Sequence, residues 1–148
     1  MRILIPMIVL LLVPGAGAQL RRGTAAAGRA DETTRIINDC ERRTNSFKKT
    51  LDRALARDNV RAGQGREDQL NRNASNLENA LDKVGDSWNR DHSLDKTRAS
   101  VRTAIAFGND INQAMRTWNM GGDAESEWST LRAELNRLAQ TFNLPRIR

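Results

Sequence analysis

Apolar residues recur along this chain at alternating spacings of three and four positions in four successive stretches. That spacing places the apolar side chains on one face of an α-helix, so each stretch predicts an amphipathic helix. The predicted helices cover residues 31–58, 67–88, 94–118 and 123–144. The short polar link at residues 89–93 makes the helices on either side of it antiparallel neighbours. We therefore predict an all-α fold, an antiparallel up-and-down four-helix bundle with seams like those of a coiled coil.

Each predicted seam presents about one apolar or small side chain per helical turn. In chain order the seam residues are Ile37, Cys40, Thr44, Phe47, Leu51, Ala54 and Leu55, then Leu70, Ala74, Leu77, Leu81, Val84 and Trp88, then Leu94, Val101, Ile105, Ile111, Met115 and Trp118, then Ala124, Trp128, Leu131, Leu135, Leu138 and Phe142. Isolated helices of this length are marginal in water, whereas burying each large seam residue contributes roughly 1.5–3 kcal/mol. The helices are therefore expected to pack together in one domain.

A shift of 54 positions aligns the second predicted helix with the fourth and places Leu81 on Leu135 and Asn89 on Asn143. Heptad patterns align easily by chance, so the polar matches carry the weight. Two interpretations remain open. The bundle consists of two duplicated helical hairpins, or it has no internal repeat.

The first residues have the pattern of an export signal. Arg2 precedes an apolar run at residues 3–13, and Ala16 and Ala18 form the small-x-small motif that signal peptidase recognises. The run is shorter than the roughly 20 apolar residues needed to span a bilayer. We expect residues 1–18 to be a signal peptide cleaved after Ala18, with no transmembrane segment after processing.

Processing would leave an exported protein, periplasmic or secreted, in which three regions are predicted. Residues 19–30 are rich in Gly, Ala and Arg without periodicity, and we expect a flexible basic arm. Residues 31–144 form the four-helix bundle domain. Residues 145–148 form a tail, because Pro145 is expected to stop the last helix just past Leu144.

The stretch at residues 128–144 (WSTLRAELNRLAQTFNL) resembles a helical motif of uncharacterised exported bacterial helical-bundle proteins, and residues 77–89 look like a diverged copy of it. The resemblance implies an exported bundle. It brings no functional residues with it.

Positive charge is concentrated in the first half of the chain. Residues 19–66 hold twelve Lys or Arg against six Asp or Glu, whereas residues 67–148 hold eleven against twelve. The candidate residues for binding an anionic surface are Arg42, Arg43, Lys48, Lys49, Arg53 and Arg57. The expected partner is an anionic envelope component or an acidic protein. No nucleic acid is expected, because aromatic residues for base stacking are not interleaved with the cations. The alternative is an ordinary solvated helix face.

Residues able to carry catalysis or bind a metal are few. His92 is the only histidine and lies in a polar link, where a solvated side chain is expected. Cys40 is the only cysteine and falls on a seam, so it is expected to be buried. No Glu-x-x-His pair of a di-iron bundle is present. We therefore predict a protein that is not an enzyme, with no catalytic residues, no cofactor and no metal site.

Three functions remain open. The first is an exported, non-enzymatic helical module that acts by protein or envelope-surface contacts through its basic half. The second is a periplasmic chaperone-like bundle, which requires an exposed apolar surface. The third is a carrier of a small ligand or metal.

Overall fold

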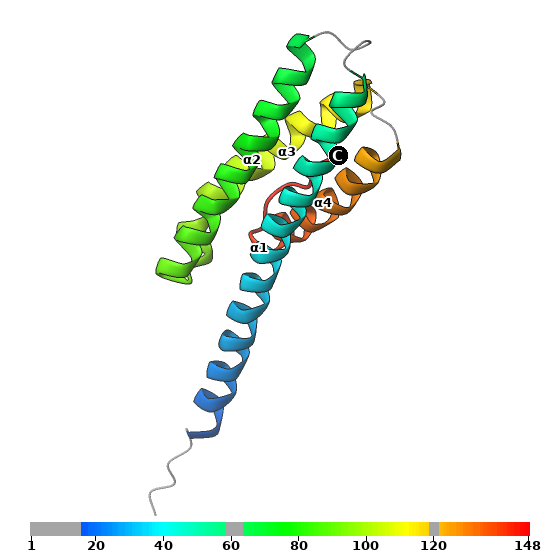
Figure 1. The fold of residues 1–148 in the computed structure, drawn as a ribbon. Coiled ribbons are helices and arrows are strands. Elements are labelled where there is room, and N and C mark those ends of the chain that lie inside the picture. Colours follow the sequence, from blue (N-terminus) through cyan, green and yellow to red (C-terminus); the bar gives the residue numbers. More distant parts are fainter. Residues whose placement is uncertain (1–15, 59–63, 119–121) are drawn as a thin grey trace, which may run out of the picture.

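The computed structural model describes residues 16–58, 64–118 and 122–148, with side chains from residue 27 onward except residues 57, 58, 64 and 66. Four helices follow one another in these ranges, with no strand: α1 at Ala16–Asp58, α2 at Gln64–Asp91, α3 at Leu94–Trp118 and α4 at Gly122–Thr141 (Figure 1). The predicted all-α four-helix architecture is confirmed.

The helices form a ring in which each contacts two others. α1 packs against α2 and α4, and α3 packs against the same two, whereas α1 and α3 do not contact each other in the described part of the chain. The α2–α3 and α1–α4 pairs make the most extensive contacts, and α3 and α4 make the fewest. α1 and α3 therefore lie diagonally across an up-and-down bundle.

The bundle core consists of the predicted seams with two exceptions, and both are at the ends of α3. Leu94 is 38% exposed and Trp118 is only partly buried. They are the first and last residues of α3, where the neighbouring helices no longer cover the seam. The prediction that Leu94 is a seam residue is therefore wrong. Buried residues that the seams did not include are Thr33, Ile36, Ala80, Gly85, Thr97, Ala104, Gly108, Asn112, Ala139 and Ile147.

α1 begins at Ala16, well before the start predicted near Asp31. Residues 19–30, predicted to be a flexible arm, are helical. Ala and Arg have high helix propensity, and a glycine inside a helix costs only about 1 kcal/mol. The start of α1 extends beyond the ends of the other helices (Figure 1), so no packing surface imposes an apolar period on it. Of the predicted leader at residues 1–18, residues 1–15 lie outside the described residues and residues 16–18 belong to α1.

The link between α2 and α3 is shorter than predicted, because α2 continues to Asp91. Only His92 and Ser93 lie between the two helices, and His92 takes a left-handed conformation with φ of 44°. The His92 amide donates to the Trp88 carbonyl at 2.8 Å, and the Ser93 carbonyl accepts from the Thr97 amide at 3.1 Å. The tight reversal explains why α2 and α3 pack closely along their length.

α4 ends at Thr141 rather than at Leu144. Asn143 has φ of 52°, and the amides of Leu144 and Asn143 donate to the carbonyls of Ala139 and Gln140 at 2.8 and 3.1 Å. This pair of bonds is a Schellman motif, which ends a helix with a left-handed residue. The helix therefore ends three residues before Leu144, where Pro145 was expected to stop it.

Residues 145–148, predicted to be a tail beyond the bundle, fold back onto α3 and α4. Ile147 is 4% exposed, and a Cβ atom placed on Gly108 of α3 would lie 2.6 Å from its Cδ1. Asn136 of α4 accepts a hydrogen bond from the Ile147 amide at 2.7 Å. Asn112 of α3 donates from its side-chain amide to the Arg148 carbonyl. The absence of a side chain at Gly108 makes room for Ile147, and the last residues complete the core.

Burial repeats at the same 54-residue shift that relates the sequences of α2 and α4. The buried pairs are Leu70 and Ala124, Ala74 and Trp128, Leu77 and Leu131, Leu81 and Leu135, Val84 and Leu138, Gly85 and Ala139, and Trp88 and Phe142. The rings of Trp88 and Phe142, which the shift relates, also contact each other at a centroid distance of 6.2 Å. In α1 and α3 the agreement is limited to the middle of the helices. The pattern favours two duplicated hairpins.

Candidate functional site

The face of α1 opposite the core carries an exposed row of residues at spacings of four and three, which we call the outer stripe. Its members are Asp31, Arg35, Asn38, Arg42, Asn45, Lys49, Asp52 and Ala56, and all are exposed. Cations occupy every seventh position at Arg35, Arg42 and Lys49, with an asparagine between successive cations. Seven residues of helix rise about 10 Å. The outer stripe therefore presents three cations in a line, with its acidic residues only before the first cation and after the last.

The predicted anion-binding residues differ in how exposed their side chains are. Arg42, Lys49 and Arg53 are exposed, whereas Arg43 is half-buried. The Lys48 ammonium forms an ion pair with the Glu78 carboxylate of α2 and is turned toward the α1–α2 interface. The side chain of Arg57 lies outside the part that is described. Of the five residues whose side chains are described, only Arg42, Lys49 and Arg53 are thus exposed.

Arg35 belongs to the outer stripe and was missed by the sequence analysis. Its signal was present in the chain, because Arg35, Arg42 and Lys49 are separated by seven residues each. The predicted start of the first helix near Asp31 placed Arg35 in the first turn, where no face of the helix is yet defined. A longer α1 assigns Arg35 to the same face as Arg42.

One ion pair partly neutralises the middle of the outer stripe. The Arg42 guanidinium lies 2.7 Å from the Asp39 carboxylate one turn earlier, and the Arg42 side chain remains 70% exposed. An exposed pair of this kind contributes at most about 1 kcal/mol and is screened by salt. Arg42 can therefore exchange Asp39 for another anion at little cost.

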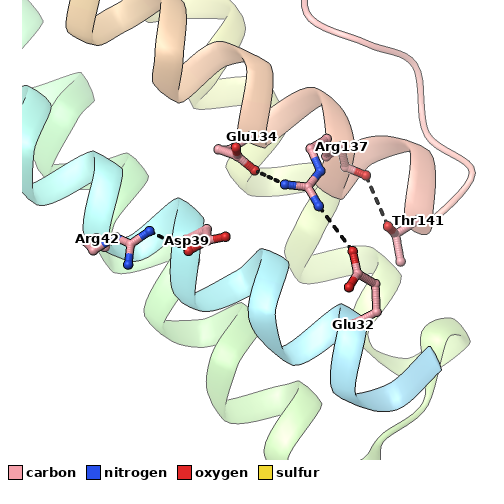
Figure 2. Close-up of polar contacts among 6 residues, drawn as sticks. All are labelled: Glu32, Asp39, Arg42, Glu134, Arg137 and Thr141. Atoms are coloured by element: carbon pink, nitrogen blue, oxygen red, sulfur yellow. Dashed lines mark hydrogen bonds and ion pairs between the residues drawn. The ribbon is translucent and has the colours of Figure 1, made fainter. Parts of the chain in front are cut away.

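The side of α1 next to α4 is fixed by a second set of charges. Figure 2 shows Arg137 of α4 between two carboxylates, with its guanidinium 2.9 Å from Glu134 and 3.1 Å from Glu32 of α1. Its main-chain carbonyl accepts from the Thr141 hydroxyl at 3.1 Å. Arg137 thus links the two helices, and its charge is already matched.

Acidic residues gather on the opposite side of α1, next to α2. The half-buried Glu41 carboxylate lies over Gly85, where a Cβ atom would be 2.8 Å from its Oε1. Burial raises the pKa of Glu41, and the nearby carboxylates of Asp82 and Asp86 raise that pKa further. Asp82 and Asp86 are exposed. Within the described ranges, no group of three or more His, Cys, Asp or Glu residues could hold a metal ion.

The chain has one cysteine, Cys40, and one histidine, His92. In the described structure neither belongs to a nucleophile–base pair. Cys40 is fully buried, as predicted. Burial raises the pKa of its thiol, and the nearby Glu134 and Asp39 carboxylates add to that rise. A buried thiol of raised pKa is a poor nucleophile. His92 is exposed and stacks edge-on against Trp88 at a centroid distance of 5.6 Å.

Searches of family models, curated proteins and solved structures for similarity to this chain find no match. The resemblance of residues 128–144 to exported helical-bundle proteins therefore stays a prediction. The described helices include none that is both long enough and apolar enough to cross a membrane. Export and cleavage after Ala18 likewise stay predictions.

Proposed function

We propose that this protein is an exported, non-enzymatic binding module whose first helix contacts an anionic envelope component or an acidic protein. The observation that carries the proposal is the outer stripe of α1, with Arg35, Arg42 and Lys49 exposed at seven-residue intervals. Between Arg35 and Lys49, about 21 Å along the helix, every member of the stripe is a cation or an asparagine. A line of cations and amide groups suits a surface that offers many anionic oxygens.

The position of α1 in the bundle favours this use of its outer face. α1 packs on α2 and α4 through its other sides, so the outer stripe is free to approach a partner without opening the core. The extension of α1 beyond the other helices (Figure 1) lengthens the surface that it can present.

The chaperone-like alternative has less support. A chaperone surface for unfolded clients needs contiguous exposed apolar side chains. Among the described residues, Leu94 is the only large apolar side chain that is exposed, and it lies at the start of α3. One isolated leucine does not form such a surface.

Binding to anionic vesicles or to a cell-envelope fraction tests the proposal by co-sedimentation. Attraction between exposed charges is screened over about 8–10 Å at physiological salt, so retention should fall steeply as salt rises. Replacing Arg35, Arg42 and Lys49 together by glutamine should remove most of the retention. The melting temperature should change little, because all three side chains are exposed.

A matched variant separates the outer stripe from net charge. Lys83, Arg90 and Arg102 are exposed on α2 and α3, and their replacement by glutamine removes the same three charges. We expect this control to keep most of the retention of the unmodified protein. Equal loss in the two variants would mean that only overall charge matters. Retention that is indifferent to salt would remove the basis of the proposal.

A further inference from the structure

The surface of α3 bears a polar hollow of about 370 Å³, on the diagonal opposite to α1. Its volume falls in the range of small-molecule sites, but such sites are mostly apolar. This hollow is lined by Asn109, Asn112, Gln113, Arg116 and Thr117 of α3 and by Arg148 of the last residues. The lining contains amides, one hydroxyl and two guanidinium groups. It contains no carboxylate side chain and no apolar side chain.

The position of Arg148 at this hollow is determined by the packing of the residues before it. Ile147 is buried beside Gly108, and its amide donates to Asn136 at 2.7 Å. The Asn112 side-chain amide binds the Arg148 carbonyl. These contacts hold the backbone on either side of the Ile147–Arg148 peptide bond. Arg148 therefore faces α3 from a second element, anchored in the core.

Asn112 also brings a third guanidinium to the edge of the hollow. Its Oδ1 accepts from Trp128 Nε1 and from the Arg132 guanidinium, each at 3.1 Å. Asn112 is only 4% exposed, so its hydrogen-bonding groups are used within the protein. Arg132 is thereby fixed next to the hollow that Arg116 and Arg148 line.

Other hydrogen-bond donors of the lining are used within α3, so the guanidinium groups of Arg116 and Arg148 are its main donors. The Asn109 amide nitrogen donates to the Ile105 carbonyl at 3.1 Å, and the Thr117 hydroxyl donates to the Gln113 carbonyl at 2.9 Å. None of the described carboxylates forms an ion pair with Arg116 or Arg148. Arg116 and Arg148 thus come from different elements, and no carboxylate side chain stands beside them in the lining.

We propose that this hollow is a binding site for a small oxyanion, a phosphate or a carboxylate group. Guanidinium groups bind both through paired, charge-assisted hydrogen bonds. The negative end of the α3 dipole accounts for a cation at Arg116, in the last turn of that helix. The dipole does not account for Arg148, which lies outside α3 in a segment anchored to the core. The site is separate from the outer stripe of α1 and does not depend on the function proposed for it.

Amide and arginine side-chain NMR signals followed during titration test the site, with inorganic phosphate in one series and acetate in the other. Ionic strength is held constant with chloride. We expect saturable shifts confined to Gln113, Arg116, Thr117 and Arg148 with at least one of the two anions, and the anion that saturates first identifies the preferred group. Shifts that never saturate, or that chloride alone reproduces, would overturn the proposal.

Glutamine variants assign the binding to the two arginines. Arg116→Gln and Arg148→Gln should each weaken binding about tenfold or more, because each removes a charge-assisted interaction. The controls are Arg102→Gln, on α3 outside the lining, and Arg146→Gln, in the same terminal segment, which should change affinity less than about twofold. Unchanged signals of Ile147 and Asn136 would show that the terminal segment stays packed in the Arg148 variant. Equal loss in the controls would reduce the effect to net charge and refute the site.

Discussion

The indole N–H groups of both buried tryptophans and the buried Thr44 hydroxyl have hydrogen-bond partners. Trp88 Nε1 donates to Thr34 Oγ1 at 2.9 Å, and Trp128 Nε1 donates to Asn112 Oδ1 at 3.1 Å. The buried Thr44 hydroxyl donates to the Cys40 carbonyl one turn earlier at 2.8 Å. A buried polar group without a partner costs roughly 1–3 kcal/mol, so each match removes a penalty. The two buried tryptophans thereby contribute large apolar rings to the core without leaving their indole N–H groups unpaired.

Glu41 is a half-buried residue whose surroundings disfavour its ionised form. A carboxyl group with a pKa raised by folding binds its proton more tightly in the folded than in the unfolded protein. Its ionised form therefore destabilises the fold above the raised pKa, and the penalty is relieved as the pH falls toward 4.5, the ordinary pKa of a glutamate side chain. Glu41→Gln should raise the melting temperature at pH 7 and lose that advantage near pH 4. The gain should stay below about 1 kcal/mol, because Asp82 and Asp86 are exposed and screened.

Melting temperatures of the unmodified protein and of the Glu41→Gln variant, compared at pH 7 and near pH 4, test this prediction. Asp110→Asn is the control, because Asp110 is exposed on α3, which does not contact α1. A destabilising Glu41→Gln change at pH 7 would contradict the sign of the effect.

At the scale of elements, periodicity was a reliable guide wherever a helix had a partner. All the seam residues predicted for α2, from Leu70 to Trp88, are buried. Where no partner exists the pattern carried no information. The start of α1 forms by propensity alone, so its helix was not predicted. The outer stripe has a seven-residue period of its own, but its residues are polar and do not predict which cations are exposed. Only the structure shows that the neighbouring Lys48 is turned away toward Glu78.

The terminal segment is the element that local patterns could not predict. Ile147 is a single apolar residue between two arginines, and a segment of this length has no period. Its burial depends on the space above Gly108, 39 residues earlier, and on the side chains of Asn112 and Asn136. A glycine inside a helix either weakens it or allows a close contact. The structure shows that Gly108 makes a close contact with this segment.

Ile147→Ala should lower the free energy of unfolding by about 2–4 kcal/mol, in the range of buried Ile→Ala changes. The cause is loss of the side chain that fills the space between Gly108 and Leu135. Urea denaturation followed by circular dichroism measures the change. Arg146→Ala, with an exposed side chain in the same segment, should cost less than about 0.5 kcal/mol. Similar small costs for both variants would show that the segment does not contribute to the core.

At the scale of the whole molecule, a twofold arrangement would relate α2 to α4 and α1 to α3. The most extensive contacts, α2 with α3 and α1 with α4, follow such an arrangement, whereas α1 contacts α2 more extensively than α3 contacts α4. The surface does not follow this symmetry. The outer stripe is a feature of α1, whereas the hollow is a feature of α3 and the terminal segment. The burial pattern of the core thus repeats at the 54-residue shift, whereas the two candidate binding surfaces do not.

The repeat predicts matched energetics at equivalent core positions. Leu81 and Leu135 are related by the 54-residue shift, and both have 0% exposure. Leu→Ala at either position should lower the free energy of unfolding by about 2–5 kcal/mol, the range for fully buried leucines. The two values should agree within about 1 kcal/mol if both sites relax to a similar extent around the cavity. Leu135 also touches the space above Gly108, so any excess should fall on Leu135→Ala and should shrink when Ile147→Ala is already present. Denaturation of the single and double variants provides both comparisons, and costs below about 0.5 kcal/mol at both leucines would contradict the shared core.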